Sequence, residues 1–390
     1  MLILIVVAGC IVAVLAFEYF WHQRARRRIP IRIHVNGIRG KSSVVRLIAA
    51  GLREGGIKTW AKVTGTLPNL VDDCGEDVPI IRGSASSIIE QRAVVAAAAG
   101  AGVKALVLEC MALDPAFQRA EETLLRPTIG VITNVRPDHE EVFGASMLDV
   151  ALALSNTVPR RGTLVITAGE GYGVLETVAG RKRTRLRMVE TEGLPDSLVE
   201  GFSYIEHKDN VALALAVCEE VGVSRETAHA GMRKCEGDAG ALRVFSLTRE
   251  GKTLEFVSAL AANDPESTAI VYRRVVVEGL PPAPVLVLAN SRKDRPLRSL
   301  QLGRLLAEIP ASRYLLSGND SEAVMGEAVK AGVPRDSLEV IESDLPEEIV
   351  ERIFGAAESR SIVFAMGNTA GPGLAVADYF RDMGVVAAAS

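Results

Sequence analysis

Short apolar runs that end in polar clusters recur along this chain. Residues 31–35 alternate apolar and polar side chains, which is the period of a strand. Helices are predicted over residues 44–52 and 86–100 and from Glu206 onward. Further strands are predicted at residues 59–63, 103–109, 128–133, 163–167, 253–257, 285–289 and 361–365. Alternating strands and helices predict an α/β fold with mostly parallel sheets.

The first residues of the chain have the character of a membrane anchor. Residues 1–16 are uncharged and almost wholly apolar, residues 17–21 add an aromatic end, and four arginines follow by position 28. We expect residues 1–22 to span a membrane once, with the arginines holding the C-terminal side of the span in the cytoplasm. A cleavable signal peptide fits poorly, because no positive charge precedes the apolar run. The alternative is a buried N-terminal helix.

Length and composition limit the remaining possibilities. A chain of 390 residues with 48% hydrophobic residues suits two ordinary domains, which we place at residues 30–238 and 239–390. The formal net charge of −4 gives no case for nucleic-acid binding. The five cysteines show no metal-ligand spacing, so free thiols in a reducing compartment are expected.

A glycine turn with a Lys-Ser pair links the first strand to the first cytoplasmic helix. Gly37 and Gly40 permit a tight turn, and Lys41, Ser42 and Ser43 open the helix. Backbone amides and the helix N-terminus can then face an anion, the lysine adds charge, and the first serine reaches Mg²⁺. The spacing differs from G-x-x-x-x-G-K-[ST], and a plain strand–helix turn is the alternative. We predict that these five residues bind nucleotide phosphate.

Polar side chains also follow two other predicted strands. Glu109 ends the strand at 103–109, and Asn134, Asp138 and His139 follow the strand at 128–133. Ligands of open α/β sheets bind at the carboxyl ends of the strands. Glu109 is therefore placed for a metal or a catalytic proton, with a solvated loop glutamate as the alternative. His139 is expected to bind a ligand rather than to be a surface histidine.

The helix predicted from Glu206 has a polar first turn. His207 and Asn210 are expected to share a face there, where polar side chains can meet a ligand. The alternative is an ordinary amphipathic core helix. Between these sites, residues 57–90 read as a region of substrate loops around the strand at 59–63.

These motifs occur in an order that resembles the Mur ligase superfamily of ATP-dependent amide-forming ligases, which includes folylpolyglutamate synthase. The glycine turn with Lys41-Ser42 is similar to the phosphate loop of that family. Glu109 corresponds to its metal-binding glutamate, residues 133–139 to its T-N…D-H motif, and residues 207–210 to its adenine-contacting segment. The resemblance covers residues 31 to about 300.

One branch of the superfamily is more similar. Residues 47–66, 262–267 and 367–371, with the anchor and the arginine cluster, resemble the ligase subunits of poly-γ-glutamate synthases, the PgsB/CapB family. The resemblance implies a P-loop Mur-ligase-like central domain, a smaller Rossmann-like C-terminal α/β domain and one N-terminal transmembrane helix. No separate N-terminal domain for a uridine nucleotide fits before the phosphate loop, which argues against a cell-wall precursor as substrate.

The resemblance also implies a reaction and its cofactors, ATP and Mg²⁺. A glutamyl carboxylate would attack the γ-phosphate to form an acyl phosphate, which a glutamate amine then converts to an amide. Lys41 would neutralise the β- and γ-phosphates, and Ser42 and Glu109 would hold Mg²⁺. His139 would bind a second Mg²⁺ or the acyl phosphate. The family places a carbamylated lysine about fifteen residues after this histidine, but no lysine lies between it and Lys182, so a second metal site stays open.

Other residues and partners follow from the same resemblance. Asn134 would orient its loop, His207 and Asn210 would contact the nucleotide, and Arg243 from the second domain would clamp the γ-phosphate on closure. Glutamate and a poly-γ-glutamate chain are the expected substrates. PgsC/CapC-like and PgsA/CapA-like membrane subunits are the expected partners, and a homo-oligomer is expected.

Two other functions remain open from the sequence. The first alternative is a membrane-tethered assembly or export ATPase, which would release ADP without forming an amide. A folylpolyglutamate-synthase-like ligase that adds a single glutamate to a small acceptor is the second alternative. The product distinguishes the three: polymer, none, or a singly glutamylated acceptor.

Overall fold

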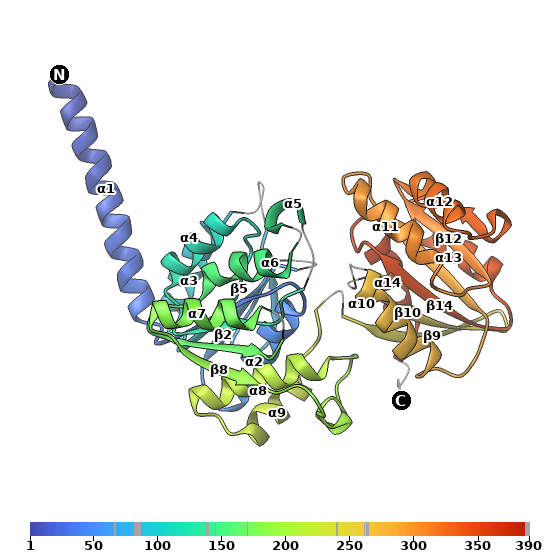
Figure 1. The fold of residues 1–390 in the computed structure, drawn as a ribbon, viewed down its shortest axis with the longest axis horizontal. Helices are drawn as coiled ribbons and strands as arrows, with labels where there is room; N and C mark the ends of the chain where they lie inside the picture. The colour runs from blue at the N-terminus through green and yellow to red at the C-terminus, as the bar shows by residue number, and fades with distance from the viewer. Residues whose placement is uncertain are drawn as a thin grey trace. The chain divides into compact units, whose positions relative to one another are not determined.

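A computed structural model describes residues 1–65, 68–81, 87–136, 140–144, 146–169, 171–238, 241–260, 262 and 265–386. The chain divides into two compact units, Met1–Glu236 and Gly237–Ser390. Each unit is built on its own sheet, so the two are described separately (Figure 1).

The first unit contains an eight-stranded sheet in the order β4-β3-β2-β5-β1-β6-β7-β8. Six neighbouring strands from β2 to β8 run parallel, and β3 and β4 are antiparallel additions at one edge. The strands are β1 (Ile31–Asn36), β2 (Thr59–Val63), β3 (Asn69–Val71), β4 (Asp77–Pro79), β5 (Ala105–Glu109), β6 (Ile129–Ile132), β7 (Thr163–Thr167) and β8 (Arg185–Val189).

Helices cover both faces of this sheet, because alternate residues of each strand point to opposite sides. Val107 of β5 packs with α2, α8 and α9, whereas its neighbours Leu106 and Leu108 pack with α3 and the end of α4. The helices are α1 (Leu2–Arg27), α2 (Lys41–Glu54), α3 (Glu90–Gly100), α4 (Pro115–Leu125), α5 (Glu140–Phe143), α6 (Met147–Leu154), α7 (Tyr172–Lys182), α8 (Lys208–Val221) and α9 (Arg225–Arg233). Both faces are therefore dry, as a parallel sheet requires.

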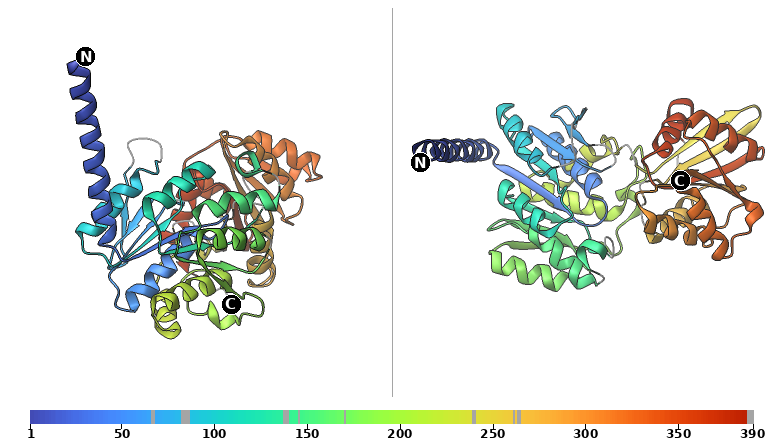
Figure 2. Two further views of the ribbon diagram at one scale, coloured as in Figure 1. Left: turned by 60° about the vertical axis from the view of Figure 1, so that its left-hand side comes forward. Right: turned by 90° about the horizontal axis from the view of Figure 1, so that it is seen from above.

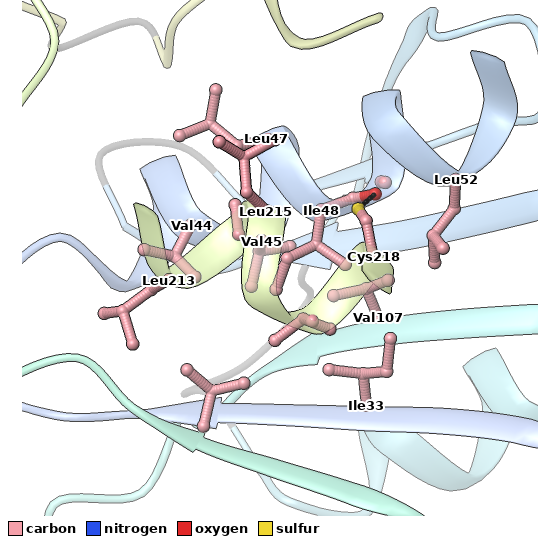
Figure 3. Close-up of a cluster of buried hydrophobic side chains, with 14 of the residues drawn as sticks. Ile33, Val44, Val45, Leu47, Ile48, Leu52, Val107, Leu213, Leu215 and Cys218 are labelled. Carbon is pink, nitrogen blue, oxygen red and sulfur yellow. Dashed lines mark hydrogen bonds between the residues drawn. The ribbon is translucent and has the colours of Figure 1, made fainter. Parts of the chain in front are cut away.

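The hydrophobic core beneath α2 positions the N-terminus of that helix at the end of β1. Val44, Val45 and Ile48 of α2 meet Leu213 and neighbouring side chains of α8 above the sheet (Figure 3). The two helices approach closely, because a Cβ at Gly51 would lie 2.8 Å from Cys218 Sγ. The burial of this face holds the N-terminus of α2 at the end of β1.

Helix α1 is one continuous 26-residue helix (Figure 2). Residues Ile3–Arg27 are long and apolar enough, at a mean hydropathy of 2.6, to cross a membrane by length and composition. Its last turns dock on the first unit: Ala25 is buried against α3, and His22 Nε2 lies 2.9 Å from the carbonyl oxygen of Leu124 on α4. The apolar helix and the α/β body are thus joined without a flexible linker.

The second unit contains a seven-stranded sheet in the order β13-β12-β11-β14-β10-β9-β15. The five strands from β13 to β10 are parallel, and β9 and β15 are antiparallel to their neighbours. The strands are β9 (Arg243–Arg249), β10 (Lys252–Ser258), β11 (Val285–Ser291), β12 (Arg313–Gly318), β13 (Leu338–Val340), β14 (Arg360–Gly367) and β15 (Val385–Val386). The helices are α10 (Pro265–Val271), which continues as a π-helical turn Tyr272–Val277, α11 (Pro296–Leu306), α12 (Ser321–Lys330), α13 (Pro346–Ala356) and α14 (Pro372–Met383).

The structure departs from the predicted elements in several places; the helix predicted over residues 86–100, for example, begins at Glu90. Residues 57–90, expected to be substrate loops around one strand, also contain β3 and β4, which pair as an antiparallel hairpin beside β2. The helix expected from Glu206 begins at Lys208, with His207 in an extended conformation before it. Short edge strands lack the length for a clear alternating pattern, which is why the hairpin was missed.

Candidate active site

The turn between β1 and α2 can accept only glycine at its two ends. Gly37 has φ +132° and Gly40 has φ +77°. A Cβ at Gly37 would lie 2.1 Å from Thr133 Oγ1, and one at Gly40 would lie 2.5 Å from Asn210 Oδ1. The turn is thus pressed between the end of β6 and the start of α8, which brings three separate sequence motifs together.

Two residues after β6 hold the middle of this turn. Thr133 Oγ1 donates to the carbonyl oxygen of Arg39 at 2.6 Å. Asn134 makes two hydrogen bonds to the backbone of Arg39: its Oδ1 accepts from Arg39 N at 3.0 Å, and its Nδ2 donates to Arg39 O at 3.0 Å. The turn is therefore held in one conformation before any ligand arrives, which lowers the ordering cost of binding.

Lys41, the first residue of α2, folds its side chain back over the turn. Its Nζ donates to Gly37 O at 2.8 Å and to Ile38 O at 3.3 Å. The first amides of a helix have no acceptor within the helix, and the helix dipole adds partial positive charge there. An ammonium group, a helix N-terminus and a glycine turn at one point form a cradle for a phosphate.

Ser42 and Glu109 face each other beside this cradle. Ser42 Oγ donates to Glu109 Oε2 at 3.0 Å, and the same carboxylate oxygen accepts from Thr64 N at 2.6 Å. Glu109 is the last residue of β5 and is only 3% exposed. A buried carboxylate and a hydroxyl are oxygen donors of the kind that Mg²⁺ or Mn²⁺ prefers, so these two residues fit a divalent metal at the phosphates.

The start of α8 closes the other side of the turn through a buried carboxylate. Glu206 Oε1 accepts from Asn210 Nδ2 and from His207 N, each at 2.8 Å. Burial raises the pKa of Glu206, against the hydrogen bonds from Asn210, the His207 amide and Ser43, which act to lower it. Ser43, predicted to contact nucleotide, is thus linked to α8. Asn210 is buried against Gly40, whereas His207 is exposed.

A second set of buried polar side chains lies behind Glu109. His34 Nε2 and Cys110 Sγ lie 3.5 and 2.9 Å from Glu121 Oε2. Gln91 Nε2 donates to Glu121 Oε1 at 3.1 Å and to the backbone oxygen of Glu109 at 3.2 Å. Burial raises the pKa of the Cys110 thiol well above its usual value, so the thiol stays protonated. This network connects the strand end that carries Glu109 to α3 and α4.

The described structure does not test the remaining predicted residues. Asp138 and His139 lie outside the described residues, so a metal or acyl-phosphate role for His139 stays a prediction. Arg243 is the first residue of β9 in the second unit, and its role at the γ-phosphate also stays a prediction.

Sequence reasoning missed Glu206 and Thr64 as parts of the site. Thr64 acts through its backbone amide, for which a side-chain pattern gives no signal. Glu206 could have been found from the sequence, because it is an acidic residue directly before a helix whose first turn is polar.

Comparisons with known proteins identify the family. Residues 35–215 match the Mur ligase middle domain, and residues 244–383 match the poly-gamma-glutamate synthase CapB C-terminal domain. PGA synthase CapB of Bacillus subtilis is 34% identical over 375 residues, which cover 95% of each chain. The chain belongs to the CapB family of poly-γ-glutamate synthases. The capsule biosynthesis protein CapB of Bacillus anthracis is also 34% identical, over 91% of this chain and 77% of that protein.

Solved structures agree on the fold. Folylpolyglutamate synthase of Mycobacterium tuberculosis superposes with a TM-score of 0.70 at 18% identity, covering 91% of this chain and 92% of that one. FolC of E. coli gives 0.69 at 14% identity, covering 93% and 91%. The predicted Mur-ligase-like α/β fold is confirmed. Membership of the CapB family confirms the predicted reaction class, an ATP-dependent amide ligase of poly-γ-glutamate synthesis.

Proposed function

We propose that this CapB-family ligase activates a glutamyl carboxylate as an acyl phosphate on the cradle formed by Gly37, Gly40 and Lys41. The observation that carries the proposal is the Ser42–Glu109 pair, joined at 3.0 Å beside the first turn of α2. Phosphoryl transfer depends on positioning and charge stabilisation, and the site supplies both.

ATP and Mg²⁺ are the proposed nucleotide and metal. Solved structures of similar fold contain ADP, or AMPPNP with Mn. Ser42 and Glu109 would hold the metal, with His139 as a further proposed ligand. Mg²⁺, when bound, neutralises charge on the β- and γ-phosphates. Asn210 and His207 are the proposed nucleotide contacts from the start of α8, and Arg243 is the proposed γ-phosphate contact from the second unit.

The proposed reaction has two steps. A glutamyl carboxylate oxygen attacks the γ-phosphorus, and the bond from that phosphorus to the ADP oxygen breaks. Lys41 stabilises the charge that remains on the phosphates, while the Asn134 contacts keep the turn in place. The amine of an incoming glutamate then attacks the acyl carbon, phosphate leaves with the carboxylate oxygen, and the amine loses a proton. Exclusion of water at this stage protects the acyl phosphate from hydrolysis.

We also propose that the catalytic part faces the cytoplasm. Arg24, Arg26, Arg27 and Arg28 follow the apolar helix directly, and positive charge at the end of a membrane span favours the cytoplasmic side. PgsC/CapC-like and PgsA/CapA-like membrane subunits are the proposed partners, because one helix offers no pore for an exported polymer. Assembly as a homo-oligomer belongs to the same proposal.

The test measures ADP release and γ-linked product in membranes that carry the protein with its candidate partner subunits. Glutamate-dependent ADP release that keeps step with polymer is expected. Lys41→Ala should abolish both, and Lys330→Ala, at a 75%-exposed lysine on α12, should change neither. ADP release without any amide product would contradict the ligase proposal and favour an assembly ATPase.

A further inference from the structure

A groove of about 460 Å³ lies where the end of α1 meets α4. Tyr19, His22 and Arg26 of α1 line one wall, and Arg119 and Leu124 of α4 line the other. None of these residues contributes to the nucleotide cradle. A ligand of this groove would therefore be separate from the nucleotide.

Arg26 and Arg119 bring positive charge to the groove. Arg26 is 6% exposed and donates to the oxygen atoms of Gln23 and of the Leu124 carbonyl. Arg119 donates to Asn156 Oδ1 at 3.2 and 3.3 Å. Within the described ranges neither guanidinium is paired with a carboxylate. A buried guanidinium bonded only to neutral oxygens favours an anionic ligand.

The position of the groove along the chain indicates where that anion comes from. Seventeen uncharged residues precede Glu18, which pairs with Arg92 just before the groove. Tyr19 and Trp21 follow at the level of the groove, where aromatic side chains mark the boundary of a bilayer. Just before α4 and in its first turn, Leu113 and Phe117 are 43% and 58% exposed, so two large apolar side chains are available there to contact an apolar phase. The groove therefore lies at the depth of lipid headgroups.

We propose that this groove binds the headgroup phosphate of an anionic phospholipid, with Arg26 and Arg119 as its contacts and Leu113 and Phe117 at the bilayer surface. The inference rests on the membrane anchoring proposed above. Bound lipid would attach α4 as well as α1 to the membrane, so the catalytic unit would be held by two elements rather than by a single helix.

The test is native mass spectrometry of the full-length chain in detergent, titrated with phosphatidylglycerol or phosphatidylcholine. One retained phosphatidylglycerol per chain is expected, with weaker retention of phosphatidylcholine. Arg119→Gln and Arg26→Gln should each weaken phosphatidylglycerol binding by about tenfold or more, as the loss of one charge-assisted contact implies. Arg24→Gln is the matched control, because Arg24 is exposed on the same helix outside the groove. Arg119→Lys, which keeps the charge, covers the case in which a neutral variant fails to fold.

Three results would overturn the proposal. Equal retention of the two lipids would show that charge is not recognised. Equal losses in Arg24→Gln and Arg119→Gln would show only diffuse attraction. Displacement of phosphatidylglycerol by an equal concentration of inorganic phosphate would assign the groove to a free anion. Because binding is measured without turnover, lipid retention by a chain that makes no amide would contradict the proposed function alone.

Discussion

The contact between Gly40 and Asn210 offers a quantitative test of the nucleotide cradle. Gly40→Ala adds a Cβ 2.5 Å from Asn210 Oδ1, in a residue with φ +77°. Gly56 has the same φ of +77° at the far end of α2, and nothing lies within 4 Å of its added Cβ. Gly56→Ala therefore carries the same backbone strain without the contact.

The expected cost has two parts. A left-handed conformation costs a non-glycine residue roughly 1–2 kcal/mol, and this part applies to both variants. Crowding against Asn210 adds roughly 1–3 kcal/mol in Gly40→Ala alone. Asn210 cannot move away cheaply, because it is buried and its Nδ2 donates to the buried Glu206 at 2.8 Å. Gly40→Ala should thus lose roughly 2–5 kcal/mol of unfolding free energy.

Urea unfolding and the binding of a fluorescent ATP analogue measure the two effects. Gly56→Ala should bind the analogue normally, and Gly40→Ala should bind it about tenfold more weakly or worse, because Asn210 is displaced at the cradle. Adding Asn210→Ala to Gly40→Ala should recover part of the lost stability, which would show that the two sites are coupled. Equal nucleotide affinity in the two glycine variants would refute the assignment of this turn.

Three further predictions concern single side chains. Lys41→Ala should lower ADP formation by about a hundredfold or more while circular dichroism stays unchanged, and near-normal turnover would remove the lysine from the site. Glu109→Gln keeps an acceptor for the Thr64 amide but loses the negative charge, so half-maximal activity should need about tenfold more Mg²⁺. An unchanged Mg²⁺ titration of activity would show that Glu109 is not a metal ligand. Burial raises the pKa of Glu206 in the folded protein above its unfolded value of about 4.3. Protonated Glu206 therefore stabilises the fold fully below about pH 4.3, and this contribution is lost as pH rises through the folded pKa. As pH rises above about 4.3, the unfolding free energy should therefore fall less in Glu206→Gln than in the wild type, as urea titrations at a series of pH values can check.

Much of this architecture was predictable because buried parallel strands carry a strong local signal. β1, β2, β5 and β7 lie where apolar runs predicted them, and Glu109 lies at a strand end as expected from the sheet rule. What brings Gly40 against Asn210 is the packing of α2 on α8, and residues 170 apart in the chain have no local pattern that records their contact. The buried pairing of His34 with Glu121 was likewise out of reach, since it depends on which helix covers that face of β1.

The central claim is that a glutamyl carboxylate is activated by phosphoryl transfer before the amide forms. Its most direct test supplies glutamate labelled with ¹⁸O in the γ-carboxylate to membranes carrying the active complex, and measures label in the released phosphate by mass spectrometry. The acyl-phosphate route predicts one labelled oxygen in phosphate for each amide formed from a labelled γ-carboxylate. Unlabelled phosphate released in step with polymer would contradict it.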